Sequence, residues 1–257
     1  MTSADKHSES ILGVRVDDLS LSDFLNYIED TINEDHKSTI SYVNIHAMNL
    51  AFTIPWFRKF LLDSDIVFCD GFGVKLGMWL NNKRIRYRYT PPDFIEDICQ
   101  RACRNEYHLF FLGARDGVAE KAASRLREKF PGLKIRTQHG YFQKEKDSPE
   151  NQKTIEEINA FRTNLLFLGM GMPLQEQWIC ENLELLKINI AFPAGALFDY
   201  ISGEQIRAPR WMTDHGLEWI GRLLIEPRRL WRRYIMGNPI FFWRVFVHEI
   251  LKRKLPK

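Results

Sequence analysis

The sequence lacks the marks of a secreted, membrane-spanning or disulfide-stabilised chain. The first ten residues, MTSADKHSES, contain no apolar stretch of the kind found in a secretory signal. An apolar segment near the C-terminus, NPIFFWRVFVHEIL, is shorter than the roughly 20 residues that cross a bilayer, and Arg244 and Glu249 interrupt it. The four cysteines form no CxxC pair, which favours reduced thiols in a core. We therefore expect a cytoplasmic protein.

Signatures of common nucleotide and metal sites are also missing. The turn GARDG is not a complete GxGxxG, and the next strand ends in Gln138 and His139 where a dehydrogenase carries an acidic residue. The absence of GxxxxGK[ST] excludes a phosphate-loop NTPase. The one DxD, at 63–65, precedes its strand and is interpreted as a solvated turn. We expect no cofactor and no metal.

The chain has no net positive charge outside its C-terminal end. Residues 207–257 contain 12 Lys/Arg and 4 Asp/Glu, a balance of +8; the totals of 36 and 33 leave 24 and 29, or −5, for residues 1–206. The segment 207–234, RAPRWMTDHGLEWIGRLLIEPRRLWRRY, has seven arginines and no lysine. Arginine forks bind phosphates through paired hydrogen bonds, so this composition favours a diphosphate or an anionic surface as the tail's partner.

Apolar runs followed by glycine turns and helical patterns recur along the chain. Strands are predicted at ILGVRV, STISYVN, DIVFC, YHLFFLG and NLLFLG, with early helices over about 21–33 and 47–62. Strands of consecutive apolar residues are typical of parallel sheets covered on both faces. The sequence therefore predicts an α/β fold: a mostly parallel, Rossmann-like sheet with helices on both faces. We expect a catalytic core over 1–206 and a helical, basic and aromatic appendage over 207–257.

In such sheets ligands bind at the carboxyl ends of the strands. Polar or glycine residues fall at these ends, at Asn44, Asp70, Gly113, Gly169 and Gly171. Each glycine alone is equally consistent with a simple turn, but together these positions favour a nucleotide-type crevice. Asp70, in CDGFG, is the candidate general base, and its alternative role is to cap the following helix.

Two further segments carry candidate anion-binding residues. If NNKRIRYRYTPPDF is extended, Arg84, Arg86 and Arg88 share one face and can supply the positive charge that a metal would otherwise provide. In GMGMPLQEQW, Gln175 and Glu176 lie in the first turn of a helix, where exposed N–H groups favour an anion or a polar sugar. Solvated surface charges and a plain helix start are the alternatives.

Segments in order along nearly the whole chain resemble the WecG/TagA/CpsF glycosyltransferases: YVN, CDGFGV, RYTPPD, FLGMGMPLQEQW, FPAGALFDYISGEQIRAP and GLEWIGRLLIEPRRLWRRY. The resemblance implies an α/β core that binds a UDP-sugar. It also implies inverting transfer of the sugar to a polyprenyl-diphosphate-linked saccharide at the inner face of the bacterial membrane, in cell-surface polysaccharide or teichoic-acid-type biosynthesis. N-acetylmannosamine, its uronic acid and glucose remain open as the donor sugar.

The resemblance also implies roles for individual residues. Asp70 matches the proposed general base, and Arg88 matches the arginine that steadies the departing diphosphate. Donor-side roles are implied or inferred for Tyr42, Asn44, Gly113, Tyr141, Gly169, Gly171, Gln175 and Asp199. This sequence departs from the family pattern at Tyr42, where threonine is expected, and in TPPD, which replaces a glycine-containing turn.

Helical periodicity in the tail predicts two helices, the second beginning at Pro227. We expect Arg222, Arg229 and Arg232, beside tryptophan and tyrosine, to contact an anionic membrane and the acceptor diphosphate. The acidic core and Asp70 argue against nucleic acid. The alternatives are a soluble sugar-nucleotide enzyme whose tail is a homo-oligomer interface, a pair of helices packed on the core, and a non-enzymatic membrane scaffold.

Overall fold

The computed structural model describes residues 7–209, 212 and 216–251. These residues form two compact units. The described residues of the first unit are 21–41 and 90–206, and those of the second are 7–20, 42–89 and the segment after 206. The predicted core, 1–206, therefore contributes to both units, and a separate role for the tail stays a prediction.

The first unit is built on parallel strands in the order β3-β8-β7-β5-β6. Their bounds are β3 (Ser38–Val43, whose last two residues belong to the second unit), β8 (Ile190–Pro193), β7 (Leu165–Gly169), β5 (His108–Gly113) and β6 (Lys134–Gln138). Every residue of β7 and β8 is buried, as expected where both faces of a parallel sheet are covered. The predicted α/β fold with a mostly parallel sheet is confirmed.

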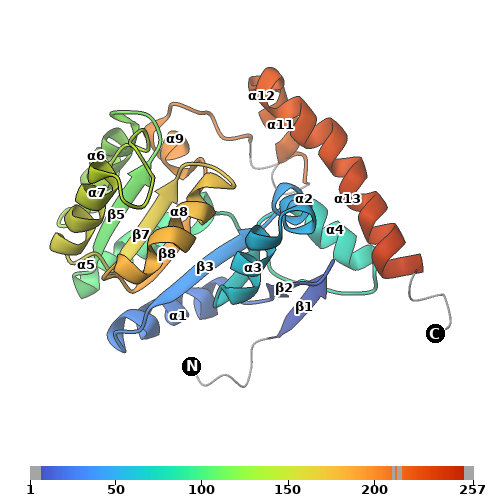
Figure 1. Ribbon diagram of the computed structural model, residues 1–257, viewed down its shortest axis with the longest axis horizontal. Coiled ribbons are helices and arrows are strands. Elements are labelled where there is room, and N and C mark those ends of the chain that lie inside the picture. The colour runs from blue at the N-terminus through green and yellow to red at the C-terminus, as the bar shows by residue number, and fades with distance from the viewer. Residues whose placement is uncertain (1–6, 210–211, 213–215, 252–257) are drawn as a thin grey trace. The chain divides into compact units, whose positions relative to one another are not determined.

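Helices cover this sheet and close its core (Figure 1). They are α1 (Leu21–Asn33), α5 (Pro91–Asn105), α6 (Val118–Lys129), α7 (Pro149–Ala160), α8 (Leu174–Asn182), the short η1 (Leu183–Leu185) and α9 (Leu197–Ser202). A continuous run of phenylalanine rings, with neighbouring centroids 4.4–5.8 Å apart, joins α1 and α5 to the strands and α9: Phe24, Phe94, Phe192, Phe167, Phe111 and Phe198. These buried rings form part of the apolar core of the unit.

The second unit has strands in the order β1-β2-β4, followed by the end of β3. Their bounds are β1 (Ser8–Ile11), β2 (Val14–Asp17) and β4 (Ile66–Cys69), with β1 antiparallel to β2 and β2 parallel to β4. The prediction of a single strand at ILGVRV is wrong. Leu12 and Gly13 both have positive φ, 51° and 75°, which is the geometry of a tight hairpin turn between two strands.

The helices of the second unit are α2 (Ile45–Thr53), α3 (Pro55–Asp63), α4 (Phe72–Leu80), α11 (Glu218–Ile225), α12 (Pro227–Trp231), the π-helical turn η2 (Arg232–Met236), α13 (Gly237–Val245) and the π-helical turn η3 (Phe246–Leu251). The one helix predicted over 47–62 is two, because the chain leaves the helical conformation at Ile54 and Pro55 starts the next helix. The predicted start at Pro227 is confirmed.

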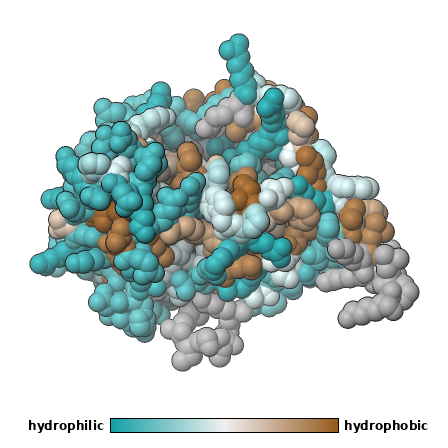
Figure 2. Space-filling view, in the orientation of Figure 1, coloured by the Kyte–Doolittle hydropathy of each residue, from teal (hydrophilic) through white to brown (hydrophobic). Residues whose placement is uncertain are grey.

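The C-terminal helix α13 packs on α2 and α4 of the same unit. At Gly77 in α4, an added Cβ would lie 2.9 Å from the ring of Phe241 in α13, so the two helices touch at a point that has room only for glycine. Many apolar side chains of these helices remain exposed, and they form brown surface beside α13 in Figure 2. Within the described residues, no helix combines the length and the apolarity needed to cross a bilayer.

Backbone contact between two glycines holds the strand ends of the first unit. Gly113 ends β5 with φ at 146°, and a Cβ there would lie 2.5 Å from the carbonyl carbon and oxygen of Gly169 at the end of β7. A side chain would therefore meet backbone, which cannot move aside like the tip of a flexible side chain.

We expect Gly113→Ala to destabilise the protein by roughly 2–4 kcal/mol, because it adds backbone strain to a direct clash. Urea unfolding measures the loss. Gly117→Ala is the matched control: Gly117 also has positive φ, 76°, but has no atom within 4 Å of the added Cβ, so only about 1 kcal/mol should be lost. Equal losses in both variants would contradict the close-contact explanation.

Candidate active site

Asp70 and Asn44 meet at the ends of two strands in the second unit. Asp70 directly follows β4, and its backbone N–H donates to the carbonyl of Val43 at 3.0 Å. Asn44 directly follows β3, and its Nδ2 donates to Asp70 Oδ2 at 3.0 Å. The predicted proximity of these two side chains is therefore present, and the half-buried carboxylate has one oxygen held in place.

The orientation of Asn44 is itself fixed by a helix. Asn44 is the N-cap of α2, and its Oδ1 accepts a hydrogen bond from the Ala47 N–H at 3.1 Å, which leaves Nδ2 facing Asp70. The N-cap of α4 is Gly71, so the alternative role of Asp70 as helix cap is wrong. Gly71 is needed because a Cβ would lie 2.9 Å from Cα and Cβ of Asn44.

Of the three arginines predicted to share a face, Arg88 is directed at Asp70. Its Nη1 donates to the Asp70 carbonyl oxygen at 3.2 Å. Arg86 instead pairs with the buried carboxylate of Asp18 at 2.9 Å, which also accepts the backbone N–H of Arg86. Arg84 is exposed and the segment forms no strand, so the shared arginine face stays a prediction.

Tyr42 contributes to the core beneath this group. Its side chain is buried and packs on Phe68 at 5.8 Å, and Phe68 stacks on Tyr89 at 4.9 Å. Its predicted contact with the donor stays a prediction.

Two residues that sequence reasoning missed, His46 and Arg233, belong to the same cluster. Burial, and then the charge of Arg233, lowers the pKa of His46 to about 4, so the imidazole is neutral at pH 7. Burial also lowers the pKa of Arg233, while Tyr234, Tyr42 and Asp70 act in the opposite direction. No sequence signal separates Arg233 from the neighbouring Arg232.

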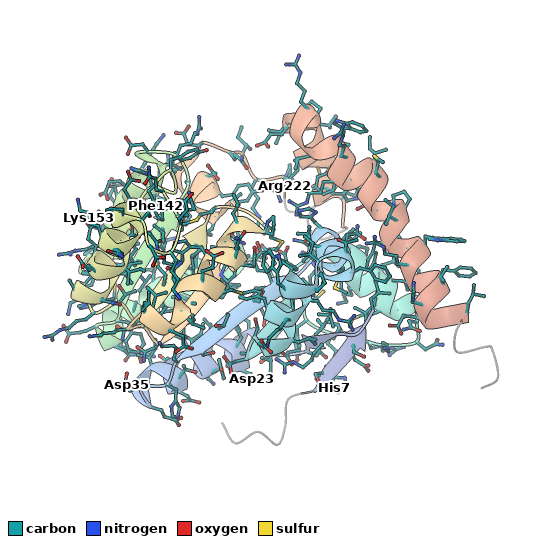
Figure 3. The ribbon with its side chains drawn as sticks, in the orientation of Figure 1. His7, Asp23, Asp35, Phe142, Lys153 and Arg222 are labelled. Atoms are coloured by element: carbon teal, nitrogen blue, oxygen red, sulfur yellow. The ribbon has the colours of Figure 1, made fainter. Side chains whose placement is uncertain are left out.

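The three predicted tail arginines differ in surroundings. Arg222, labelled in Figure 3, lies in α11, and its charge also lowers the pKa of Arg233. Arg232 is exposed and lies over the Trp231 ring at 5.3 Å. The side chain of Arg229 lies outside the described residues.

In the first unit, Gln175 joins two glycine turns. Its Oε1 accepts the N–H groups of Gly171 and Gly195, both at 3.2 Å, and its Nε2 donates to Glu176 Oε1 at 2.8 Å. Gln175 and Glu176 are fully buried. The amide oxygen is thus engaged in holding the turns after β7 and β8, and the predicted contact of Gln175 with the donor sugar stays a prediction.

The remaining predicted donor residues lie near the same strand ends or in α9. Gly140, just before Tyr141, approaches Gly113 so closely that a Cβ would lie 3.0 Å from the Gly113 Cα. The Tyr141 side chain is 73% exposed. Asp199 lies in the first turn of α9, where its carbonyl accepts the N–H of Gln205 at 3.0 Å.

Across the described part of the chain, no group of three or more His, Cys, Asp or Glu side chains is arranged to hold a metal ion. The expected independence from metal stays a prediction.

Comparison with known proteins gives a consistent result over nearly the whole chain. The model of the glycosyl transferase WecG/TagA/CpsF family matches residues 9–255. Proteins named N-acetylglucosaminyldiphosphoundecaprenol N-acetyl-beta-D-mannosaminyltransferase, from Staphylococcus aureus strains NCTC 8325 and COL, are each 25% identical over 96% of this chain and 94% of their own length. The protein of the same name from strain MW2 is 24% identical over the same shares.

The burial of Glu176 predicts that the stability of the first unit depends on pH. Its Oε2 is buried without a hydrogen-bond partner among the described residues, and burial raises its pKa from 4.5 to about 7, although the bond from Gln175 opposes the shift. Because the folded pKa exceeds the unfolded one, the contribution of Glu176 to stability is complete below pH 4.5 and is lost as the pH rises through 7.

We expect the free energy of unfolding to fall by roughly 2–3 kcal/mol between pH 5 and 8 from this group. Glu176→Gln, which keeps the shape without a titrating proton, should flatten that part of the profile. Denaturant unfolding of both proteins across the range is the measurement. Parallel profiles would show that Glu176 is not the responsible group.

Proposed function

Because the chain belongs to the WecG/TagA/CpsF family of glycosyl transferases, we propose that it moves a sugar from a UDP-sugar to a saccharide linked to undecaprenyl diphosphate, with inversion. The names of its relatives support the lipid-diphosphate acceptor. The observation that carries the proposal is the carboxylate of Asp70, held by Asn44 where β4 ends.

Inversion requires a single displacement. The acceptor hydroxyl attacks the anomeric carbon from the side opposite UDP, the bond from that carbon to the diphosphate oxygen breaks, and the hydroxyl proton passes to a base. Asp70 is the proposed base, because its carboxylate is oriented by Asn44 and is not used as a helix cap.

The departing UDP gathers negative charge on its diphosphate, which a positive group must stabilise. Arg88 is the proposed group, since its guanidinium is directed toward Asp70 and a planar fork suits a diphosphate. On this account the reaction proceeds without a metal.

The first unit is proposed to bind the nucleotide part of the donor. The backbone at the ends of β5 and β7 is free of side chains, because glycine stands at positions 113, 169 and 171. Gln175 holds the turn after β7 in place. Asp199 and Tyr141 are proposed to contact the donor as well.

N-acetylmannosamine is the first candidate for the sugar, because it is named in the relatives' activity; its uronic acid and glucose follow. The test supplies the three UDP-sugars separately, with a short-chain N-acetylglucosamine diphosphate lipid and with EDTA. Transfer from one donor in EDTA is expected. Absence of both transfer and hydrolysis with all three would contradict the proposal and favour a membrane scaffold.

We expect Asp70→Asn to lower turnover by about 10² to 10⁴ while UDP still binds, because the amide keeps the shape of the carboxylate but cannot take the proton. Steady-state kinetics with the active donor measure the effect. Asp63→Asn, at an exposed position paired with Lys59, is the control and should retain full activity. Near-normal turnover in Asp70→Asn would remove Asp70 from the mechanism.

We also propose that the protein binds an anionic membrane peripherally through its C-terminal helices. Exposed apolar side chains extend along them: Trp219, Leu224, Ile225, Trp231, Ile235, Met236, Ile240, Trp243 and Phe246. Arg228 and Arg232 are exposed on the same helices. Aromatic and aliphatic side chains interspersed with arginine are the composition of interfacial helices.

Trp243→Ser should weaken binding to phosphatidylglycerol vesicles about tenfold, since 65% of this large side chain is exposed and available to lipid. Vesicle flotation at low salt measures binding, and high salt should release the wild type. Leu185→Ser, at a 47% exposed site in the first unit, is the control. A wild type that stays soluble at low salt would favour the tail as an oligomer interface instead.

A further inference from the structure

The side-chain amide of Gln175 has two possible orientations, and only one of them fits its surroundings. Its Oε1 accepts the N–H groups of Gly171 and Gly195, while its Nε2 donates to Glu176 Oε1 at 2.8 Å. If the amide turned over, its NH₂ group would face two N–H donors. The oxygen of Glu176 therefore decides which end of the amide faces the two glycines.

The two glycines lie in turns that follow neighbouring strands. Gly171 comes after β7 and Gly195 after β8, with φ at 80° and 58°, and these strands pair with each other. Ligands of parallel α/β sheets bind outside the carboxyl ends of the strands. Gln175 and Glu176 thus connect two turns at the edge of the sheet where a nucleotide is expected.

Helix α8 holds the carboxyl group of Glu176 away from water. The side chain is fully buried in the first turn of this helix, which packs on β8 (Figure 1). Buried hydrogen bonds connect α8 to α7, from Trp178 Nε1 to Asn151 Oδ1 at 2.7 Å and from Asn151 Nδ2 to Asn182 Oδ1 at 2.8 Å. A carboxylate formed at Glu176 would therefore be unsolvated, and its Oε2 has no hydrogen-bond partner among the described residues.

Burial, rather than a neighbouring charge, controls the protonation of this group. It raises the pKa of Glu176 to about 7, hydrogen bonds from Gln175 and from the Glu176 backbone oppose the shift, and no charged side chain of the described residues contributes. Strands β7 and β8 have no titratable side chain. The charged side chains of α7, α8 and η1 other than Glu176 are exposed: Glu150, Lys153, Glu156, Glu157, Glu181 and Glu184.

We propose that Glu176 is a positioning residue of the donor site, whose carboxyl group orients the Gln175 amide and through it the two turns that receive the nucleotide part of the UDP-sugar. This assignment rests on the proposed function and deepens it. When Glu176 loses its proton, the buried negative charge attracts the neighbouring N–H donors more strongly and repels the diphosphate of the donor. Donor affinity should therefore be complete below pH 7 and fall as the pH rises through 7.

Glu176→Gln and Glu176→Leu separate the charge from the orientation. Glutamine stays neutral and keeps an oxygen for the Gln175 amide, whereas leucine removes the acceptor. Calorimetric titration with UDP at pH 6 and pH 8 compares both variants with the wild type, and the titration of UDP itself is common to all three proteins.

If only the neutral form of Glu176 binds UDP, the affinity of the wild type should fall about tenfold more between the two pH values than that of Glu176→Gln. Glu176→Leu should bind UDP about 5- to 10-fold more weakly than the wild type at pH 6, because the amide has lost one hydrogen bond that orients it. If the leucine variant fails to fold, Glu176→Gln alone carries the test.

His139→Asn is the matched control for the titrating group. Histidine also titrates near neutral pH, and His139 follows β6 in the same unit. Its Nδ1 accepts the Tyr141 N–H at 3.2 Å, and asparagine can supply an oxygen for that bond. His139→Asn should keep the pH dependence of the wild type, and loss of that dependence would assign it to His139 instead.

Two further readouts distinguish positioning from a general loss of structure. In Glu176→Leu, KM for the donor should rise about 5- to 10-fold, while kcat and KM for the acceptor change by less than about twofold. In ligand-free protein labelled with ¹⁵N-glycine, the amide signals of Gly171 and Gly195 should shift with a midpoint near pH 7 in the wild type but not in Glu176→Gln. Gly117, at the N-cap of α6, is the internal reference.

Equal pH dependence of UDP affinity in the wild type and Glu176→Gln would overturn the proposal, as would an unchanged donor KM in Glu176→Leu. The glycine signals separate this inference from the proposed function. If UDP binds but Gly171 and Gly195 do not titrate, the proposed function stands and the role of Glu176 fails. If the two glycines titrate but UDP binds at neither pH, the donor class is wrong and Glu176 only holds the turns.

Discussion

The hydrogen bond from Asn44 Nδ2 to Asp70 Oδ2 is the contact on which the candidate chemistry depends. It forms because β3 and β4 are neighbours in the sheet and each is followed at once by a polar residue. Asn44 can make it only while its oxygen caps α2, and Gly71 is required because the Asn44 backbone lies against it. The start of α2, Gly71 and the Asp70 carboxylate therefore hold one another in place, and a change in the first two is expected to disturb the carboxylate.

In the first unit, different contacts hold the strand ends and the turns that follow them. There the strand ends are held by backbone contact between Gly113 and Gly169, and the turns by the amide of Gln175. That amide also donates to Glu176, a carboxyl group whose pKa is raised to about 7 by burial. Buried polar groups of this kind specify one arrangement of the turns, at the expense of some stability when they ionise.

Much of the architecture follows from sequence because apolar runs and glycine turns report directly on buried parallel strands. The sequence correctly predicts the strand ends before Asn44 and Asp70. It also predicts the helix that begins at Pro227. The break at Pro55 was also visible, since proline ends the helix before it, and was missed only because the apolar periodicity continues across it. The TPPD segment turns out to be a capping box, with Thr90 and Asp93 bonded to each other at the start of α5.

Other features depend on geometry that a sequence does not encode locally. The hairpin at Leu12 requires positive φ in a leucine, which sequence propensity disfavours. Arg232 and Arg233 are chemically identical neighbours, yet the Arg232 side chain is exposed and the Nε atom of Arg233 is buried. The state of Glu176 likewise depends on the depth of its burial, which helical periodicity alone does not give.

The contact at Gly77 has a mechanical consequence. Because the Phe241 ring lies against α4 with no space for even a methyl group, α4 cannot tilt unless α13 moves with it. The first residue of α4 lies two positions after Asp70, so this contact links the position of α13 to the chain segment that carries the candidate base.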